Sequence, residues 1–126
     1  MNNKLLICSN VSDNWEIINQ KKIFSSFDPV VFALLLIDGL RGKSQFTFRW
    51  IHQGEEFYTN SVIITPHLDS HRVMSYMKTA VIIENKLFGL WNVTVSLNSN
   101  IINDASFKVI DCNQNEIVVS HFDIHA

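Results

Sequence analysis

Apolar and polar residues alternate along several short segments of this chain. In the segment 91–97, Trp91, Val93, Val95 and Leu97 are separated by single Asn, Thr and Ser residues. Successive side chains of a β-strand point to opposite faces, so a period of two predicts a strand with one buried and one solvated face. We therefore expect these four apolar side chains to lie in the core.

The same alternation recurs elsewhere and is interrupted by turn residues. Phe46, Phe48 and Trp50 share one face of a second predicted strand, and Gln53-Gly54 follows it as a turn signal. Apolar residues rarely recur at the three- and four-residue spacing of a helix, so we predict no helix beyond one short turn near residues 17–21. The expected strands are 4–11, 30–37, 45–52, 55–59, 61–65, 72–83, 90–97, 101–110 and 116–122.

Short strands joined by Gly, Asn and Asp turns are typical of antiparallel sandwiches and barrels. The chain has 126 residues, which fits one domain with a core of its own. No internal repeat or linker divides it. We predict a single all-β domain, residues 1–126, built as an antiparallel β-sandwich of about seven to nine strands.

The segment 30–37 differs from the other strands because both of its faces are apolar. Val31, Ala33, Leu35 and Ile37 occupy one face, and the alternate residues of the segment occupy the other. An apolar strand of this kind must be covered on both sides. One interpretation is a central strand covered by the chain's own loops. The other is a partner or dimer interface formed by those four residues.

Two segments resemble known sandwich domains. The strand pattern Gly-x-Trp-x-Val-x-Val at 89–95, followed by Phe-x-Val at 107–109, resembles the last two strands of immunoglobulin-like and fibronectin-like sandwiches, and Trp50 lies in an earlier strand. The resemblance spans roughly residues 27–110 and is nearest to accessory domains of bacterial envelope and secreted proteins. It implies an immunoglobulin-like architecture and, by analogy, a binding or spacer role. The paired core cysteines and the tyrosine corner of those domains are missing.

Composition restricts the partners and the location. The net charge is −2, and no cluster of basic residues exceeds the pair Lys21 and Lys22, so we predict no nucleic-acid binding. The longest apolar run, 30–37, is far shorter than the ~18 residues of a membrane span. The apolar patch at 5–8 is also too short for a secretory signal. We expect a cytoplasmic protein, or an envelope or secreted one if a preceding segment has been removed.

The two cysteines, Cys8 and Cys112, could pair or could remain as reduced core thiols. Two cysteines make no disulfide framework, which favours reduced thiols. Cys8 lies in an apolar run, where burial makes a thiol unreactive. The chain contains no Gly-x-Ser-x-Gly elbow for a nucleophilic serine. We therefore predict that the protein is not an enzyme and needs no cofactor.

Four of the five histidines lie in two His-x-Asp-x-His segments. In a strand the two histidines of one segment would be about 13 Å apart, too far for one metal ion. A loop could bring them together, and Pro66 suggests that the first segment is a loop. A metal-binding or metal-dependent protein is therefore the alternative function. Its ligands would come from His67, Asp69, His71, His121, Asp123 and His125.

The leading functional prediction is a non-enzymatic module that binds a protein partner, or a second copy of itself, through a sheet face or a strand edge. A homo-oligomer is expected. A further alternative is carbohydrate binding by exposed aromatic side chains. Most aromatic residues alternate into the core, but Trp15, Phe57, Tyr58 and Tyr76 do not follow this pattern and would form a contact patch if they clustered on the surface.

Overall fold

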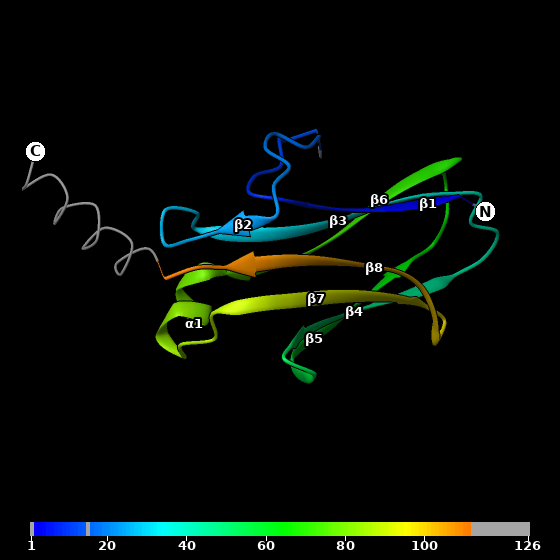
Figure 1. Cartoon of the computed structure of the whole chain (residues 1–126). Helices are drawn as coiled ribbons and strands as arrows, with labels where there is room; N and C mark the ends of the chain where they lie inside the picture. The colour runs from blue at the N-terminus through cyan, green and yellow to red at the C-terminus, as the bar shows by residue number, and fades with distance from the viewer. Residues whose placement is uncertain (1, 15, 112–126) are drawn as a thin grey trace, which may run out of the picture.

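The computed structural model describes residues 2–14 and 16–111, which form two β-sheets packed against each other (Figure 1). Strands make up 61% of these described residues, which confirms the prediction of an all-β, sandwich-like fold. One sheet has the order β1 (Asn3–Cys8), β3 (Val30–Asp38) and β6 (Ser70–Lys78). The other has the order β2 (Ile23–Phe24), β8 (Asn100–Val109), β7 (Gly89–Leu97), β4 (Ser44–His52) and β5 (Glu55–Ile64).

The ladders are antiparallel except for the short parallel pairing of β2 with β8. Tight turns join neighbouring strands where the backbone requires positive φ. Gln53 and Gly54 have φ of 50° and 83° between β4 and β5, as a two-residue hairpin turn demands. The turn predicted at this position is confirmed. The predicted last strand, 116–122, lies outside the described residues.

The core consists of the side chains that alternate inward from both sheets. Trp50, Trp91 and Phe107 are fully or almost fully buried at its centre. The rings of Trp91 and Phe107 are stacked with centroids 6.0 Å apart, and Phe107 also meets the edge of Trp50 at 5.9 Å. Each such side chain buries roughly 150–250 Å². The alternation in 45–52 and 91–97 therefore correctly predicted that the large side chains of these two strands, Trp50 and Trp91 among them, lie in the core.

Both buried indole groups have hydrogen-bond acceptors. The Nε1–H of Trp91 donates to the Leu87 carbonyl at 2.8 Å. The Nε1–H of Trp50 donates to Ser75 Oγ at 2.9 Å, and the Ser75 hydroxyl donates to Oδ1 of Asn60. This chain of polar groups joins β4, β6 and β5 across the space between the sheets. A buried polar group that lacks such a partner would destabilise the fold.

The two-faced strand is β3, the central strand of the three-stranded sheet. The four residues predicted to form a partner interface, Val31, Ala33, Leu35 and Ile37, are at most 1% exposed and belong to the main core. Their face is covered by the five-stranded sheet. The prediction that these side chains bind a partner is therefore wrong, because a partner could reach them only if the sandwich opened.

The other face of β3 is covered by the N-terminal part of the chain. The segment between β1 and β2 rises above the three-stranded sheet (Figure 1), and the Arg72 guanidinium on β6 donates to the Asn14 carbonyl at 2.7 Å. Leu6, Cys8 and Leu34 are buried on this face and lie outside the main core cluster. They form a second, smaller apolar layer.

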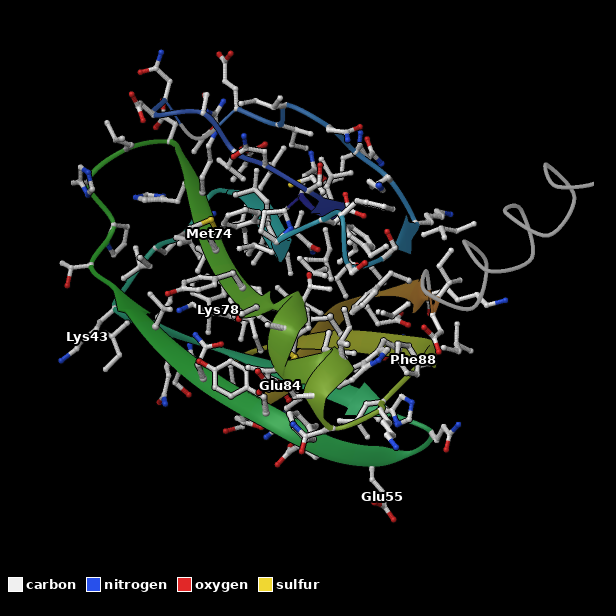
Figure 2. The ribbon with its side chains drawn as sticks, turned by 90° about the vertical axis from the view of Figure 1, so that its left-hand side faces the viewer. Lys43, Glu55, Met74, Lys78, Glu84 and Phe88 are labelled. Atoms are coloured by element: carbon white, nitrogen blue, oxygen red, sulfur yellow. The ribbon has the colours of Figure 1, made fainter. Side chains whose placement is uncertain are left out.

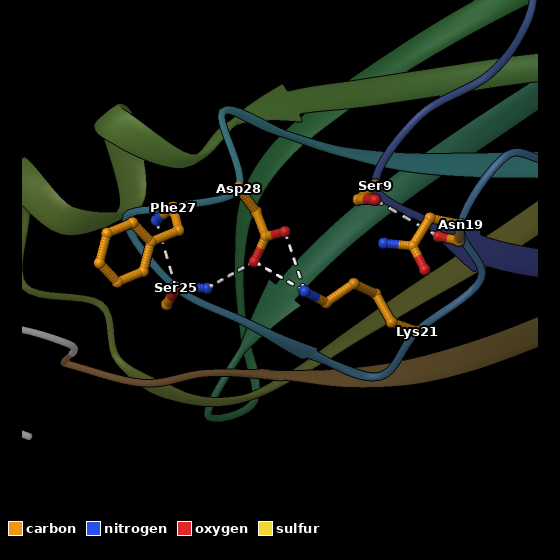
Figure 3. A network of polar contacts seen from close by, with 6 residues as sticks. All are labelled: Ser9, Asn19, Lys21, Ser25, Phe27 and Asp28. Carbon is orange, nitrogen blue, oxygen red and sulfur yellow. Dashed lines mark hydrogen bonds and ion pairs between the residues drawn. The ribbon is translucent and has the colours of Figure 1, made fainter.

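An ion pair holds the end of this covering segment in place (Figure 3). Lys21 Nζ contacts both carboxylate oxygens of Asp28, at 2.9 and 3.0 Å. The same carboxylate accepts the backbone N–H of Ser25 at 3.1 Å. Asp28 is mostly buried, so its charge would be costly without partners. The ion pair and the hydrogen bond satisfy both of its carboxylate oxygens. The segment is thus anchored beside β2.

The first predicted strand, 4–11, is shorter in the structure and ends at Cys8, and two further regions differ more. The predicted strand 72–83 is in fact β6 followed by a helix, α1 (Thr79–Glu84). The sequence there is rich in β-branched residues, but the helical turn places both Thr79 and Ile82 inward, so burial overrides local propensity. The segments 55–59 and 61–65, predicted as separate strands, form the single strand β5, which ends at Ile64.

Replacing Ser75 with alanine should lower the free energy of unfolding by about 1–3 kcal/mol, because the buried Trp50 Nε1–H would lose its acceptor. Urea denaturation would measure the change. Ser106→Ala, on the exposed outer face of β8, is the matched control and should change stability by less than about 0.5 kcal/mol. A Ser75→Ala effect as small as that of the control would contradict a stabilising role for the bond.

Candidate functional site

Within residues 2–14 and 16–111 the two sheets end in four edge strands, and three of these edges are short, partly paired or charged. On β1, the Ile7 carbonyl accepts the backbone N–H of Lys21 at 3.2 Å. β2 has only two residues. β6 carries the exposed side chains of Arg72 and Lys78. Natural sheets use these features to prevent other chains from adding a strand.

β5 is the fourth edge, and it has little of this protection. It is ten residues long, and within the described residues it pairs with β4 alone. Glu55 and Glu56 at its start are its only charged residues, and the eight residues 57–64 carry no charge. The first five residues of β5 are exposed on both faces. The outer side of this strand therefore presents backbone N–H and C=O groups that another strand could pair with.

A β-bulge shapes the start of β5. Trp50 lies opposite Tyr58, but the next residue of β4, Ile51, lies opposite Glu56, so Phe57 is the extra residue. A bulge bends the strand and redirects its side chains. The Phe57 ring reaches the core and meets Trp91 edge-on, with centroids 5.8 Å apart. Two consecutive aromatic side chains can therefore border the same surface hollow.

That hollow, here called the aromatic groove, lies between the β5 and β6 edges and has a volume of about 290 Å³. Figure 2 views the molecule from the side on which Lys78, at the end of β6, and Glu84, on α1, are in front. The side chains that line the groove are Phe57, Tyr58, Tyr76, Met77, Lys78 and Val81.

The aromatic groove contains three of the four aromatic residues predicted to be uncommitted to the core. Phe57 and Tyr58 are each 42% exposed, and Tyr76 is 50% exposed. The fourth, Trp15, lies outside the described residues. The three aromatics come from two consecutive strands that belong to different sheets. The sequence pattern therefore left open whether and where they would cluster.

A second hollow, of about 780 Å³, borders the other end of β5. Ile63 and Leu68 on its rim are 58% and 63% exposed, and His67, His71 and Arg72 also line it. The β5 edge therefore runs between an aromatic groove at its start and an apolar hollow with basic and imidazole groups at its end.

The structure brings together two of the predicted metal ligands. The His67 and His71 rings meet edge-on with centroids 5.3 Å apart, and the backbone N–H of His67 donates to His71 Nε2 at 3.4 Å. Asp69 is exposed and joins no ligand cluster. Across residues 2–14 and 16–111, no group of three His, Cys, Asp or Glu side chains could hold a metal ion.

The other three predicted ligands, His121, Asp123 and His125, lie outside the described residues. The two-segment metal site therefore remains a prediction. Of His71, the Nδ1 atom is buried and has no hydrogen-bond partner among the described residues. The contact of Nε2 with the His67 backbone N–H and the edge-on contact of the two rings hold His71 against the loop.

Cys8 has the properties of a core thiol. It is fully buried beneath the covering segment. Removal from water raises the pKa of the Cys8 thiol, and a backbone hydrogen bond near Asn10 lowers the pKa by less. A thiol with a raised pKa is a poor nucleophile at neutral pH. Cys112 lies outside the described residues, so the alternative of a disulfide between the two stays open.

No family model matches the chain, and no curated protein matches it in sequence. The described residues contain no helix with the length and hydrophobicity needed to cross a lipid bilayer. The features of the molecule that point to a function are the β5 edge and the two hollows beside it.

In a Cys112→Ser variant, Cys8 should react with iodoacetamide at least about 100-fold more slowly in the native state than in denaturant, because labelling requires local or global opening. The unfolded thiol ionises at a lower pH than the buried one. The contribution of Cys8 to the free energy of unfolding should therefore be constant at neutral pH and fall as the pH rises above the ordinary thiol pKa, as a comparison with Cys8→Ala would show. Rapid native-state labelling would contradict the burial of Cys8.

Proposed function

We propose that this protein is a non-enzymatic protein-binding module that captures an extended polypeptide by adding it as a strand to β5. The observation that carries the proposal is the combination of length, exposure and absence of charge along residues 57–64. In strand addition, main-chain hydrogen bonds supply affinity and pockets for alternate side chains supply specificity. Among the strands that the structure describes, β5 has an open edge, and it has a hollow at each end.

The geometry of β5 indicates which partner side chains would be recognised. The residues of β5 that face the core side are Tyr58, Asn60, Val62 and Ile64, since they lie opposite buried residues of β4. A strand added beside them would direct every second side chain to the same side, near the aromatic groove or the second hollow. Both hollows expose apolar side chains, so β-branched or aromatic partner residues fit best.

The order of the strands supports an immunoglobulin-like interpretation of the sandwich. β4, β7 and β8 are neighbours in one sheet in the way that strands C, F and G are in immunoglobulin domains, and β1, β3 and β6 correspond to A, B and E. Trp50 then lies on the strand that holds the buried tryptophan of such domains. We propose this class of sandwich, which commonly serves in protein recognition, as the scaffold of the binding edge.

Carbohydrate binding is a second candidate, favoured by the exposure of Phe57, Tyr58 and Tyr76 around one groove. Aromatic faces of this kind can stack on sugar rings. A glycan array separates the two functions. Glycan binding that is lost in Tyr76→Ala would favour carbohydrate, whereas peptide binding without any glycan binding would favour strand addition.

A selection of displayed random peptides on the protein should yield extended, uncharged sequences rich in β-branched or aromatic residues. Tyr58→Lys should weaken their binding at least about tenfold, because a charge directed toward the core side of an edge strand opposes strand addition. Leu90→Lys is the control; it replaces another exposed apolar residue, on a strand paired on both sides. Titration calorimetry would measure both, and equal affinities would argue against the β5 edge.

A further inference from the structure

We infer that the strand added to β5 is β5 of a second copy, so that two five-stranded sheets join into one continuous sheet about a two-fold axis. This inference rests on the proposed function, because it uses the same edge, and it names the partner. Three features of β5 support it: the distribution of charge, the register that the strand allows and the apolar area that this register covers.

The charged residues of β5, Glu55 and Glu56, lie at its start, and imidazole and guanidinium groups line the hollow at its end. Two cations also lie near the start: Lys78 lines the aromatic groove, and Arg49 pairs with Glu56 at 3.2 Å. Parallel pairing of two β5 strands would bring the glutamates of the two copies together, which is destabilising. Antiparallel pairing places the glutamates of each copy beside the imidazole and guanidinium end of the other.

Antiparallel pairing also determines which side chains of the two copies lie on the same face of the joined sheet. The two-fold axis must be perpendicular to the sheet, so core-facing residues of one copy lie opposite core-facing residues of the other. A shift of one residue would place core-facing positions opposite outward-facing ones. The axis must therefore pass midway between the two copies of one residue. We place Ser61 there, because it is the centre of the regular, uncharged stretch 58–64 that follows the bulge.

The register centred on Ser61 gives favourable pairs throughout. Tyr58 lies opposite Ile64 of the second copy, an aromatic and β-branched pair of the kind that stabilises sheets. Thr59 lies opposite Ile63, whose side chain is 58% exposed in the single chain. Moving the centre to Asn60 would place Glu56 opposite Ile64, next to apolar surface, where its charge would be desolvated.

In this arrangement each copy covers exposed apolar surface on the other. Tyr58, which is 42% exposed, is covered by a β-branched neighbour at the mouth of the aromatic groove. Because the interface is isologous, the covered area is counted twice. No residue of the main core has to move.

Cysteine cross-linking in a Cys112→Ser background tests this register. Ser61→Cys should form a disulfide-linked dimer under mild oxidation, because facing residues have Cα atoms about 4.5–5.5 Å apart, within disulfide range. Thr59→Cys is the matched control on the same outward face. Its two copies would be four residues out of register, about 13 Å apart, so it should cross-link at least about tenfold less.

Sedimentation analysis of the unmodified chain supplies the second measurement. We expect a concentration-dependent dimer that Tyr58→Lys dissociates and Leu90→Lys leaves intact. A monomer at all concentrations overturns the inference. So does a dimer that Tyr58→Lys leaves intact, or equal cross-linking at positions 59 and 61. A monomer that still binds the selected peptides through β5 would leave the proposed function standing and refute self-pairing alone.

Discussion

The fold depends on the burial of three large aromatic rings between two sheets of unequal width. Trp50, Trp91 and Phe107 fill the centre of the sandwich, and their apolar area is a major part of what holds the layers together. An indole ring is buried at little cost only when its N–H has an acceptor. The acceptor for Trp50 is Ser75 on the opposite sheet, and Ser75 in turn donates to Asn60 on β5.

This polar connection determines where the sandwich is open. It holds β6, the edge of the three-stranded sheet, near β5, the edge of the five-stranded sheet. A sheet of three strands cannot cover one of five, so the first half of β5 is exposed on both faces. The aromatic groove lies at this step between the layers, and the bulge at Phe57 directs one more ring into it. The candidate binding edge thus follows from how the core is closed.

The sequence predicted the strands better than the surfaces. The alternation in 45–52 and 91–97 identified core residues correctly, because the side-chain direction in a strand depends only on local backbone geometry. The two faces of 30–37 predicted either a central strand covered by the chain itself or a partner interface, and periodicity could not choose between them; the second sheet covers the face with Val31 and Ile37. Nor did the β-branched residues near Ile82 predict α1, because burial decided the helix there.

By itself, the sequence determined an all-β chain, the positions of its main core aromatics and the hairpin turn at Gln53-Gly54, since each is a property of a few neighbouring residues. It also contained the uncharged run 57–64, without showing that this run is an edge. Only the tertiary structure decided that β5 has one neighbour among the described strands and that Tyr76 and Tyr58 line the same groove. Strand order is a relation among segments distant in the chain, and no local periodicity specifies it.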